Sequence, residues 1–231
     1  MDWKYTKDNP LRVFEAFAGY GSQALSLKYI GIPYKVVGIA EIDPAAIRGY
    51  MSIHGDTPNY GDVSKVNWNE VPDFDLLTWS SPCQDFSNAG LQRGGAEGSG
   101  TRSSLLWEVK RIIEVKRPKY LLTENVKALV SKKFLPGFLA FCNYLEGMGY
   151  TSFRQVMNAK DYGVPQTRER IVVVSILGES WFNFPLPFEL KLRLKDVLED
   201  NVEEKFFLDD VKVANFIGQL EKEKKEMICA E

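Results

Sequence analysis

The sequence contains few of the residues on which many secreted proteins and enzymes depend. Its 231 residues include only three cysteines, at positions 83, 142 and 229, and no Cys-x-x-Cys pair. This excludes a disulfide framework and most zinc sites, and it indicates a reducing, cytoplasmic setting. The single histidine, His54, lies in a polar turn where a solvated side chain is expected. Mechanisms that need a Ser–His or Cys–His pair are therefore not favoured.

Long apolar runs and a strong net charge are also absent. No apolar segment is long enough to span a membrane, and the N-terminus has no apolar signal core. The hydrophobic content of 45% is enough for one substantial core. The net charge of −2 gives no general reason to expect nucleic acid as a partner. The charge is unevenly distributed, however. Residues 189–231 contain 12 acidic and 8 basic residues and so carry −4, which leaves a net charge of +2 on residues 1–188.

Strand and helix patterns alternate from residue 11 to residue 176. Apolar runs predict strands at 11–17, 35–40, 60–63, 74–79, 119–123, 150–157 and 171–176, and the third of these is a short strand or a turn. The alternation predicts an α/β fold with a doubly wound, mostly parallel sheet of seven strands. Ligands bind such sheets at the carboxyl ends of the strands, so polar residues that follow strands are candidates for function.

The first two strand ends carry a possible nucleotide site. Gly19 and Gly21 follow the first strand and precede a helix, and Glu41 follows the second strand about twenty residues later. Glycines allow a close backbone approach to a ligand, and an acidic residue at the second strand can bind a ribose diol. This pattern also fits a nicotinamide-binding domain, which stays an alternative at this point. Asp62, further on, has two interpretations: it is an acceptor for an adenine amino group, or it caps the turn that follows.

The fourth predicted strand delivers a cysteine to the same edge. The apolar run that begins at Phe74 stops at Pro82 and Cys83, which favours Cys83 as a nucleophile, although a lone cysteine is also a common small buried residue. The glycine-rich loop that follows, residues 85–101, is predicted to be a closing lid. The fifth strand ends in another polar residue, Glu124.

Together these strand ends resemble the cytosine-C5 DNA methyltransferase family. The matching fragments, in family order, are Phe-Ala-Gly-Tyr-Gly at 17–21, Glu-Ile-Asp at 41–43, Gly-Asp-Val at 61–63, Pro-Cys-Gln at 82–84 with Phe86 and Ser87, residues 102–106, Glu-Asn-Val at 124–126, and Gln166, Arg168 and Arg170. Their order and spacing agree over residues 11–176, and the nicotinamide alternative is correspondingly disfavoured. The resemblance implies the Rossmann-like sheet of S-adenosylmethionine-dependent methyltransferases, and a cytoplasmic enzyme of prokaryotic or phage type from a restriction-modification setting.

The resemblance also implies a cofactor, S-adenosylmethionine, with S-adenosylhomocysteine as product, and no metal. Phe17 is implied to stack on adenine, Glu41 to hold the ribose hydroxyls and Asp62 to accept from the adenine amino group. The full set of implied cofactor residues is Phe17, Ala18, Gly19, Gly21, Glu41, Ile42, Asp62, Val63, Pro82 and Leu105.

The catalytic residues implied by the resemblance are Cys83, Glu124, Arg168 and Arg170. Cytosine C5 is a poor nucleophile, so a Cys83 thiolate is expected to add at C6 first. Glu124, held among apolar neighbours, is expected to act on N3, and Arg170 on O2, with Arg168 in support or on phosphate. A structural ion pair is the alternative for the two arginines. The expected substrate is double-stranded DNA with a flipped cytosine, because the base cannot reach Cys83 inside a duplex.

The sequence departs from the family after residue 176. The family's target-recognition region and its last motif, Gly-Asn-Ala-Val, are not visible. We expect residues 1–188 to be the catalytic domain and residues 189–231 to be an acidic, partly disordered lead-in to a recognition region, so that specific methylation needs further polypeptide. Three explanations are consistent with the missing motifs: a truncated chain, a natural fragment, or one half of a split enzyme that acts with a second chain. A tRNA cytosine methyltransferase and a non-enzymatic remnant that binds cofactor or DNA stay open as alternatives.

Overall fold

The computed structural model describes residues 5–80 and 108–228, with side chains as far as Glu221. The chain forms two compact units, Met1–Leu190 and Lys191–Glu231. The first unit contains the β-sheet and all of the candidate site residues that the structure describes. Pro82, Cys83, Leu105 and the predicted lid at 85–101 lie outside the described residues.

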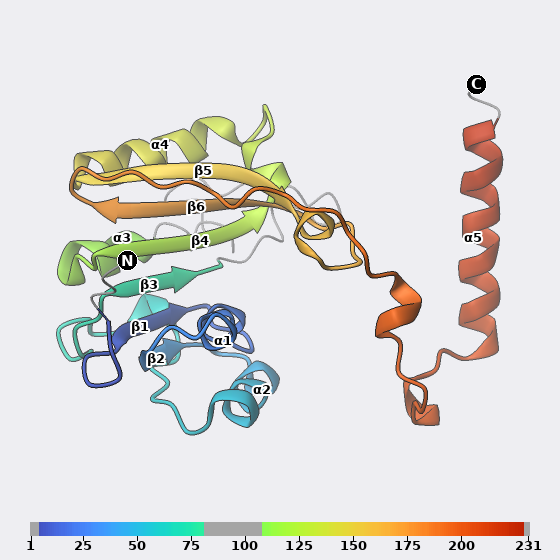
Figure 1. Ribbon diagram of the computed structural model, residues 1–231, viewed down its shortest axis with the longest axis horizontal. Helices are drawn as coiled ribbons and strands as arrows, with labels where there is room; N and C mark the ends of the chain where they lie inside the picture. Colours follow the sequence, from blue (N-terminus) through green and yellow to red (C-terminus); the bar gives the residue numbers. More distant parts are fainter. Residues whose placement is uncertain (1–4, 81–107, 229–231) are drawn as a thin grey trace. The chain divides into compact units, whose positions relative to one another are not determined.

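A six-stranded sheet forms the centre of the first unit, with the strand order β2-β1-β3-β4-β6-β5 (Figure 1). Neighbouring strands are parallel from β2 to β4, whereas β6 is antiparallel to both β4 and β5. This confirms the predicted α/β, mostly parallel, Rossmann-like sheet. The strands are β1 (Leu11–Ala16), β2 (Tyr34–Ala40), β3 (Leu76–Trp79), β4 (Tyr120–Val126), β5 (Tyr150–Asn158) and β6 (Glu169–Leu177).

The prediction of seven strands is wrong for the described residues, because the segment at 60–63 does not form a strand. Its pairing with β2 is a single bridge between Ile39 and Asn59. The backbone then turns at Gly61, whose φ of +72° suits glycine, and a 3₁₀ helix follows at Val63–Lys65. The carboxylate of Asp62 accepts the N–H of Ser64 at 3.0 Å, so this residue caps a helix rather than extending a strand.

Helices cover both faces of the sheet. On one face, Leu27 of α1 (Ser22–Tyr29) packs on Val13 and its cluster, and α2 (Pro44–His54) buries Tyr50. On the other face, α3 (Glu108–Lys116) and α4 (Leu135–Gly147) pack on the cluster that contains Phe14. Val13 and Phe14 are successive residues of β1, and successive strand residues point to opposite faces. The doubly wound arrangement predicted from the alternating pattern is therefore present.

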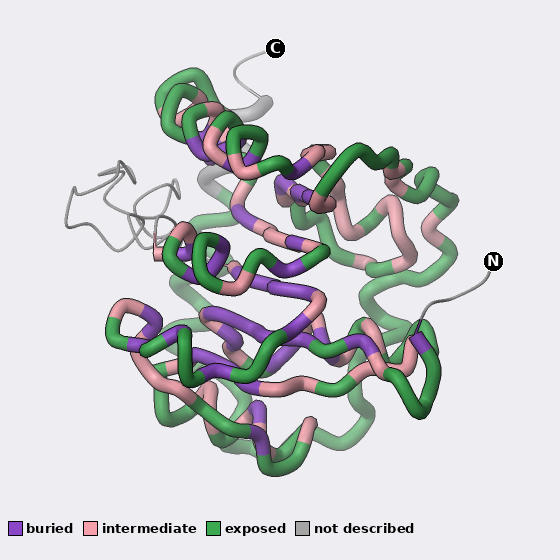
Figure 2. The backbone as a smooth tube through the Cα atoms, turned by 90° about the vertical axis from the view of Figure 1, so that its left-hand side faces the viewer, coloured by how far each residue is buried: buried purple, intermediate pink, exposed green. Residues whose placement is uncertain are grey.

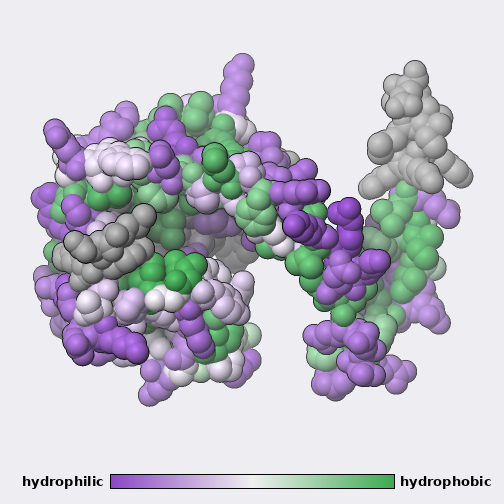
Figure 3. Space-filling model, viewed as in Figure 1, coloured by the Kyte–Doolittle hydropathy of each residue, from purple (hydrophilic) through white to green (hydrophobic). Residues whose placement is uncertain are grey.

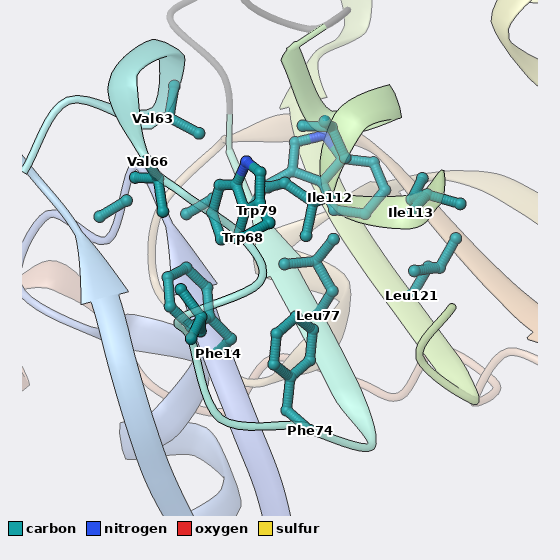
Figure 4. Packing of buried hydrophobic residues seen from close by; sticks show 14 of the residues in the cluster. Phe14, Val63, Val66, Trp68, Phe74, Leu77, Trp79, Ile112, Ile113 and Leu121 are labelled. Carbon is teal, nitrogen blue, oxygen red and sulfur yellow. The ribbon is translucent and has the colours of Figure 1, made fainter. Parts of the chain in front are cut away.

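The largest hydrophobic cluster lies between β1, β3 and the helices α3 and α4. Phe14 packs against Phe74 and Trp68, each with ring centroids 5.3 Å apart (Figure 4). All four residues of β3 are buried, as expected for a strand covered on both faces, and the buried residues concentrate in the central strands (Figure 2). This core fixes the position at which β3 ends, at Trp79, three residues before Pro82.

The start of α2 follows from local sequence. Asp43 precedes Pro44, and its Oδ1 accepts the N–H groups of Ala45 at 2.7 Å and Ala46 at 3.1 Å. These bonds, together with the first-turn proline, are the usual signals for a helix start, and they lower the pKa of Asp43. The helix therefore begins immediately after the Glu41 strand end, which keeps that end short and fixed.

After β6 the first unit ends in an extended segment that runs along β5 and β6 (Figure 1). The ring of Phe182 packs on Phe153 of β5, with centroids 6.0 Å apart. The hydroxyl of Tyr162 donates to the carbonyl of Pro185 at 3.1 Å, and the Tyr162 ring contacts Phe188. Aromatic contacts therefore hold a segment that has no regular secondary structure.

The second unit consists of two short 3₁₀ helices, Leu194–Val197 and Glu204–Phe206, and α5 (Asp210–Ile228). Several large apolar side chains are exposed on it, among them Phe206, Val211 and Phe216, and Figure 3 shows hydrophobic residues along α5. The run of lysines and glutamates at 221–226 belongs to the last turns of this helix. Among the described helices of both units, none is both long and apolar enough to cross a membrane.

One buried carboxyl group connects the sheet to the two helices on one face. Glu15 of β1 is 1% exposed, and its Oε2 accepts the Tyr50 hydroxyl of α2 at 2.6 Å. Its Oε1 accepts the N–H of Ala24, in the first turn of α1, at 3.2 Å. Burial raises the pKa of Glu15, although the bonds from Tyr50 and Ala24 act in the opposite direction.

We predict a pH-dependent contribution of Glu15 to stability. Because its pKa is higher in the folded than in the unfolded state, the folded protein binds more protons between the two values. The contribution is fully present below the unfolded pKa and is lost as the pH rises through the folded pKa. In urea unfolding measured across this range, Glu15→Gln should lack that decline. The control is Glu179→Gln, at an exposed glutamate of the same unit, and an identical pH profile for Glu15→Gln and wild type would contradict the prediction.

Candidate active site

The strand directions bring the candidate residues to one edge of the sheet. The parallel strands β1 to β4 all end there, and β6 begins there because it runs antiparallel to β4. Val126, at the end of β4, lies opposite Arg170 near the start of β6. The segments after β1, β2, β3 and β4 therefore meet the arginine segment that sequence analysis singled out.

The turn after β1 is held against the end of β2. The N–H groups of Phe17 and Ala18 both point to the carbonyl of Ala40, at 2.8 and 3.4 Å. Phe17 has a φ of +55°, an unfavourable conformation for a bulky residue, which marks a strained turn of the kind that gathers at functional sites. A Cβ at Gly21 would clash with His54 and Tyr50 of α2, so glycine is required there by packing as well as by its φ of +77°.

His54 is not the solvated turn residue that was expected. It is the last residue of α2, half-buried, with its ring 4.4 Å from that of Tyr50. Its Nε2 lies 3.1 Å from the carbonyl oxygen of Tyr20. The side chain therefore ties α2 to the glycine turn and has a structural role at the back of the site.

The Glu41 carboxylate is fixed by three backbone N–H groups. Its Oε2 accepts from Gly19 at 2.9 Å, and its Oε1 accepts from Ile42 at 2.8 Å and from Asp43 at 2.9 Å. The donors belong to two different segments, the turn after β1 and the start of the turn before α2. Charge-assisted bonds of this kind hold the carboxylate in one orientation and compensate its charge.

Asp62 faces the same space from the turn that precedes the Val63–Lys65 helix. Its Oδ1 accepts the Ser64 hydroxyl at 2.8 Å as well as the Ser64 N–H, and its Oδ2 is 3.6 Å from the Lys65 ammonium. The bonds from Ser64 lower the pKa of Asp62. This residue is therefore a second fixed carboxylate beside the strand ends.

A cavity of about 270 Å³ lies between these segments. Its volume is close to the lower end of the range for small-molecule sites, roughly 300–1,000 Å³. Five of the predicted cofactor residues line it, namely Phe17, Glu41, Ile42, Asp62 and Val63, and so do Ala40, Gly61 and Ser80, which were not predicted. Ala18, Gly19 and Gly21 lie in the adjoining turn and shape the cavity through their backbone.

The end of β3 is tied to the start of α1. Gln23 Nε2 donates to Ser80 Oγ at 3.1 Å, and Gln23 Oε1 accepts from the Ser22 hydroxyl at 3.0 Å. Ser80 is the last described residue before Cys83, which lies three positions further along the chain. Ser80 therefore both lines the cavity and lies three positions before Cys83 in the sequence.

Glu124, Arg168 and Arg170 form one charged cluster. Glu124 Oε1 is 2.9 Å from Arg170 Nε and 3.9 Å from Arg168 Nη2, and the side chains of Glu124 and Arg170 are 32% and 24% exposed. The expected apolar surroundings of Glu124 are therefore wrong, because two guanidinium groups face it. Two neighbouring strands supply the cluster. The carboxylate comes from β4, and the arginines come from β6 and the turn before it.

Two asparagines support the site and were missed from the sequence. Asn158, at the end of β5, accepts the N–H of Arg168 at 3.0 Å and so fixes that backbone. Asn59 bonds to Glu41 and Gly61, which both line the cavity. Asparagine is common in turns because its side chain bonds to nearby backbone groups. This preference was the only feature of the sequence that could have pointed to these two residues. Among the described residues, no cluster of His, Cys, Asp and Glu is suited to hold a metal.

Solved structures of methyltransferases have the same fold. The S. pombe Dnmt2 methyltransferase matches with a TM-score of 0.68 and 22% identity over 90% of this chain and 66% of that protein. The Entamoeba histolytica methyltransferase EhMeth matches with a TM-score of 0.72 and 21% identity over 87% of this chain and 63% of that protein. At these identities the similarity shows the fold alone.

Curated relatives are more similar in sequence. The type II methyltransferase M2.ScrFI of Lactococcus lactis subsp. cremoris is 40% identical over 89% of this chain and 72% of the relative. The orphan methyltransferase M.Rho11sI of Bacillus phage rho11s is 32% identical over 94% of this chain and 49% of the relative. The type II methyltransferase M.SsoII of Shigella sonnei is 36% identical over 86% of this chain and 52% of the relative. The chain therefore spans about half the length of several relatives.

The family comparison covers both the sheet and the segments that build its functional edge. The model of the C-5 cytosine-specific DNA methylases matches residues 11–228, from the first residue of β1 into α5. A match of this extent takes in the cavity residues and the Glu124 cluster together, and it excludes the nicotinamide alternative. The chain belongs to the C-5 cytosine-specific DNA methylase family.

Proposed function

We propose that this chain transfers a methyl group from S-adenosylmethionine to C5 of cytosine in DNA, through a covalent bond between Cys83 and C6. The observation that carries the proposal is the pair of Glu124 and Arg170, 2.9 Å apart, at the sheet edge that also holds the cavity around Glu41. A base at this edge would meet a carboxyl group and guanidinium donors side by side. Membership of the C-5 cytosine-specific DNA methylase family and the similarity to type II methyltransferases support the reaction class.

The cavity residues fit S-adenosylmethionine. Glu41 presents a fixed carboxylate for a ribose diol, Phe17 offers a ring for adenine, and Asp62 keeps acceptor capacity on Oδ2 for an amino group. Ile42 and Val63 add apolar surface. We assign Pro82 and Leu105 to the same pocket on the family resemblance. When bound, the cofactor supplies the electrophilic methyl group, and S-adenosylhomocysteine is the product.

The chemistry assigned to the chain begins with Cys83. Its thiolate adds to C6, which breaks the C5–C6 double bond and makes C5 nucleophilic. After C5 is methylated, a base from solvent takes the C5 proton, the electron pair of that C–H bond restores the C5–C6 double bond, and the C6–S bond breaks to release the Cys83 thiolate. Cys142 is unsuited to this role, because it is buried in a hydrophobic cluster and burial raises the pKa of its thiol.

Glu124 and the arginines are assigned to the base. Arg170 carries several N–H donors in a planar fork, so it can bond O2 while it keeps contact with Glu124. The Glu124 carboxyl group is assigned to the N3 and N4 edge, where it helps the ring to accept the charge that Cys83 adds. Arg168, at 3.9 Å from Glu124 and half-exposed, is assigned to support of Glu124 or to a phosphate.

The proposed substrate is double-stranded DNA from which the target cytosine is flipped into the site. We assign catalysis to residues 1–188 and a lead-in to a target-recognition region to residues 189–231. Several relatives are about twice as long as the part that aligns, so we propose that site-specific methylation needs further polypeptide, in the same or a second chain. The acidic charge after Glu189 opposes contact of that region with phosphates.

The first prediction from the proposed function concerns the nucleophile. In the presence of S-adenosylmethionine, mixed-sequence duplex DNA with 5-fluorocytosine in place of cytosine should form a covalent adduct with the protein, because fluorine at C5 prevents the final elimination. The assay is run on the chain alone and within any longer polypeptide that carries it. Cys83→Ala should abolish the adduct, whereas Cys142→Ala should keep it. An adduct with Cys83→Ala would disprove the assignment, and an adduct on RNA alone would favour the tRNA alternative.

The second prediction concerns the cofactor. Glu41→Ala should weaken S-adenosylmethionine binding by roughly 1.5–3 kcal/mol, because a charge-assisted pair with the ribose is lost. Isothermal titration calorimetry measures this directly. The matched control is Glu70→Ala, at an exposed glutamate of the same unit that accepts a hydrogen bond from Asn67 and does not line the cavity. Binding of NADH with no binding of S-adenosylmethionine would contradict the proposed cofactor.

The third prediction concerns Arg170. Lysine at this position keeps the charge but loses the planar fork, so Arg170→Lys should lower the rate of adduct formation by about 10- to 100-fold, or roughly 1.4–2.8 kcal/mol. The matched control is Arg12→Lys, because Arg12 makes a two-pronged pair with Asp75 at the opposite edge of the sheet. Equal rates for the two variants would argue for the structural ion-pair alternative.

A further inference from the structure

The pairing between β2 and residues 58–60 stops after one step. The N–H of Ile39 donates to the carbonyl of Pro58 at 2.9 Å, and the N–H of Tyr60 donates to the carbonyl of Ile39 at 2.8 Å. A longer parallel pairing would continue this ladder to Glu41, which is two residues after Ile39 and directly follows β2. The structure has no such backbone pairing among the described residues, since the only bridge joins Ile39 and Asn59.

The side chain of Asn59 takes the place of the next peptide group. Its Oδ1 accepts the N–H of Glu41 at 3.2 Å, and its Nδ2 donates to the carbonyl of Glu41 at 3.0 Å. A side-chain amide has the same donor and acceptor as a peptide, so both backbone groups of Glu41 are satisfied as they would be in a sheet. The main chain after Asn59 is therefore free to leave β2.

The same amide also fixes the chain where it leaves. Oδ1 of Asn59 accepts the N–H of Gly61 at 3.0 Å, and Gly61 has a φ of +72°. After the turn at Gly61, Asp62 and Val63 line the same cavity as Glu41 and Ile42. One side chain thus bonds to two segments that line the cavity, and Asn59 itself does not line it.

We propose that Asn59 is a positioning residue for the cofactor pocket: its side-chain amide replaces a strand and sets the distance between Glu41 and Asp62. This inference rests on the proposed function, because it takes the cavity to be the S-adenosylmethionine site. Asn59 acts through Glu41 and Gly61, so its removal should weaken cofactor binding without removing any group that touches the cofactor.

The test compares Asn59→Ala with Asn67→Ala. Asn67 is also an exposed asparagine in a turn of the same unit, where it bonds Glu70 and the N–H of Asn69, but it does not line the cavity. Calorimetry with S-adenosylmethionine should give an affinity about three- to tenfold lower for Asn59→Ala, the size expected for lost hydrogen bonds, and no change for Asn67→Ala. The increase of Tm caused by the cofactor should shrink only in Asn59→Ala, whereas a merely structural role would lower the Tm without ligand and leave that increase unchanged.

A third variant, Asn59→Asp, keeps both acceptor bonds, but it replaces the Nδ2 donor with a charged oxygen that faces the carbonyl of Glu41. Its affinity should be no higher than that of Asn59→Ala, because repulsion takes the place of the lost hydrogen bond. If wild type binds the cofactor and Asn59→Ala binds equally well, or if Asn59→Asp binds as well as wild type, the role of Asn59 is disproved and the proposed function stands. If wild type does not bind S-adenosylmethionine, the proposed function and the role of Asn59 are both wrong.

Discussion

The direction of each strand is the constraint on which the candidate site depends. Because β1 to β4 are parallel, the residues that follow them all emerge at one edge. Because β6 is antiparallel to β4, its first residues rather than its last lie at this edge, and Arg170 comes opposite Val126. A parallel β6 would have placed Arg170 at the other end of the sheet from Glu124. The buried cluster around Phe14 and Leu77 holds these strands in register and so keeps the edge fixed.

The carboxylates at this edge are held in different ways, and the difference suits different tasks. Glu41 and Asp62 accept bonds from backbone N–H groups, which fix them as acceptors beside the cavity. Glu124 instead faces the side chains of Arg168 and Arg170, which can move and exchange partners. Under the proposed function, a rigid acceptor suits the holding of a cofactor, and an exchangeable ion pair suits a group that engages a base as it arrives.

The supporting residues lie one step away from the cavity. Glu15 joins β1 to α1 and α2 from inside the protein, through Ala24 and Tyr50. Asn59 joins β2 to the turn at Gly61 from the exposed side. Each replaces a backbone contact that a longer strand or a tighter packing would supply. The strained turn at Phe17 is therefore enclosed by elements whose positions are fixed independently of any ligand.

The amino-acid sequence was enough to predict the alternation of strands and helices, the polar residues at the strand ends and the family, because these depend on local periodicity and on short motifs. It did not determine the loss of the strand at 60–63, which follows from the turn at Gly61 and the side chain of Asn59. It also gave the wrong surroundings for Glu124, because the arginines lie about 45 residues away in the chain and meet it only across the antiparallel pair of β4 and β6. Local patterns encode where a strand ends, whereas the partner across a sheet is decided by strand order and direction, which arise only when the whole core packs.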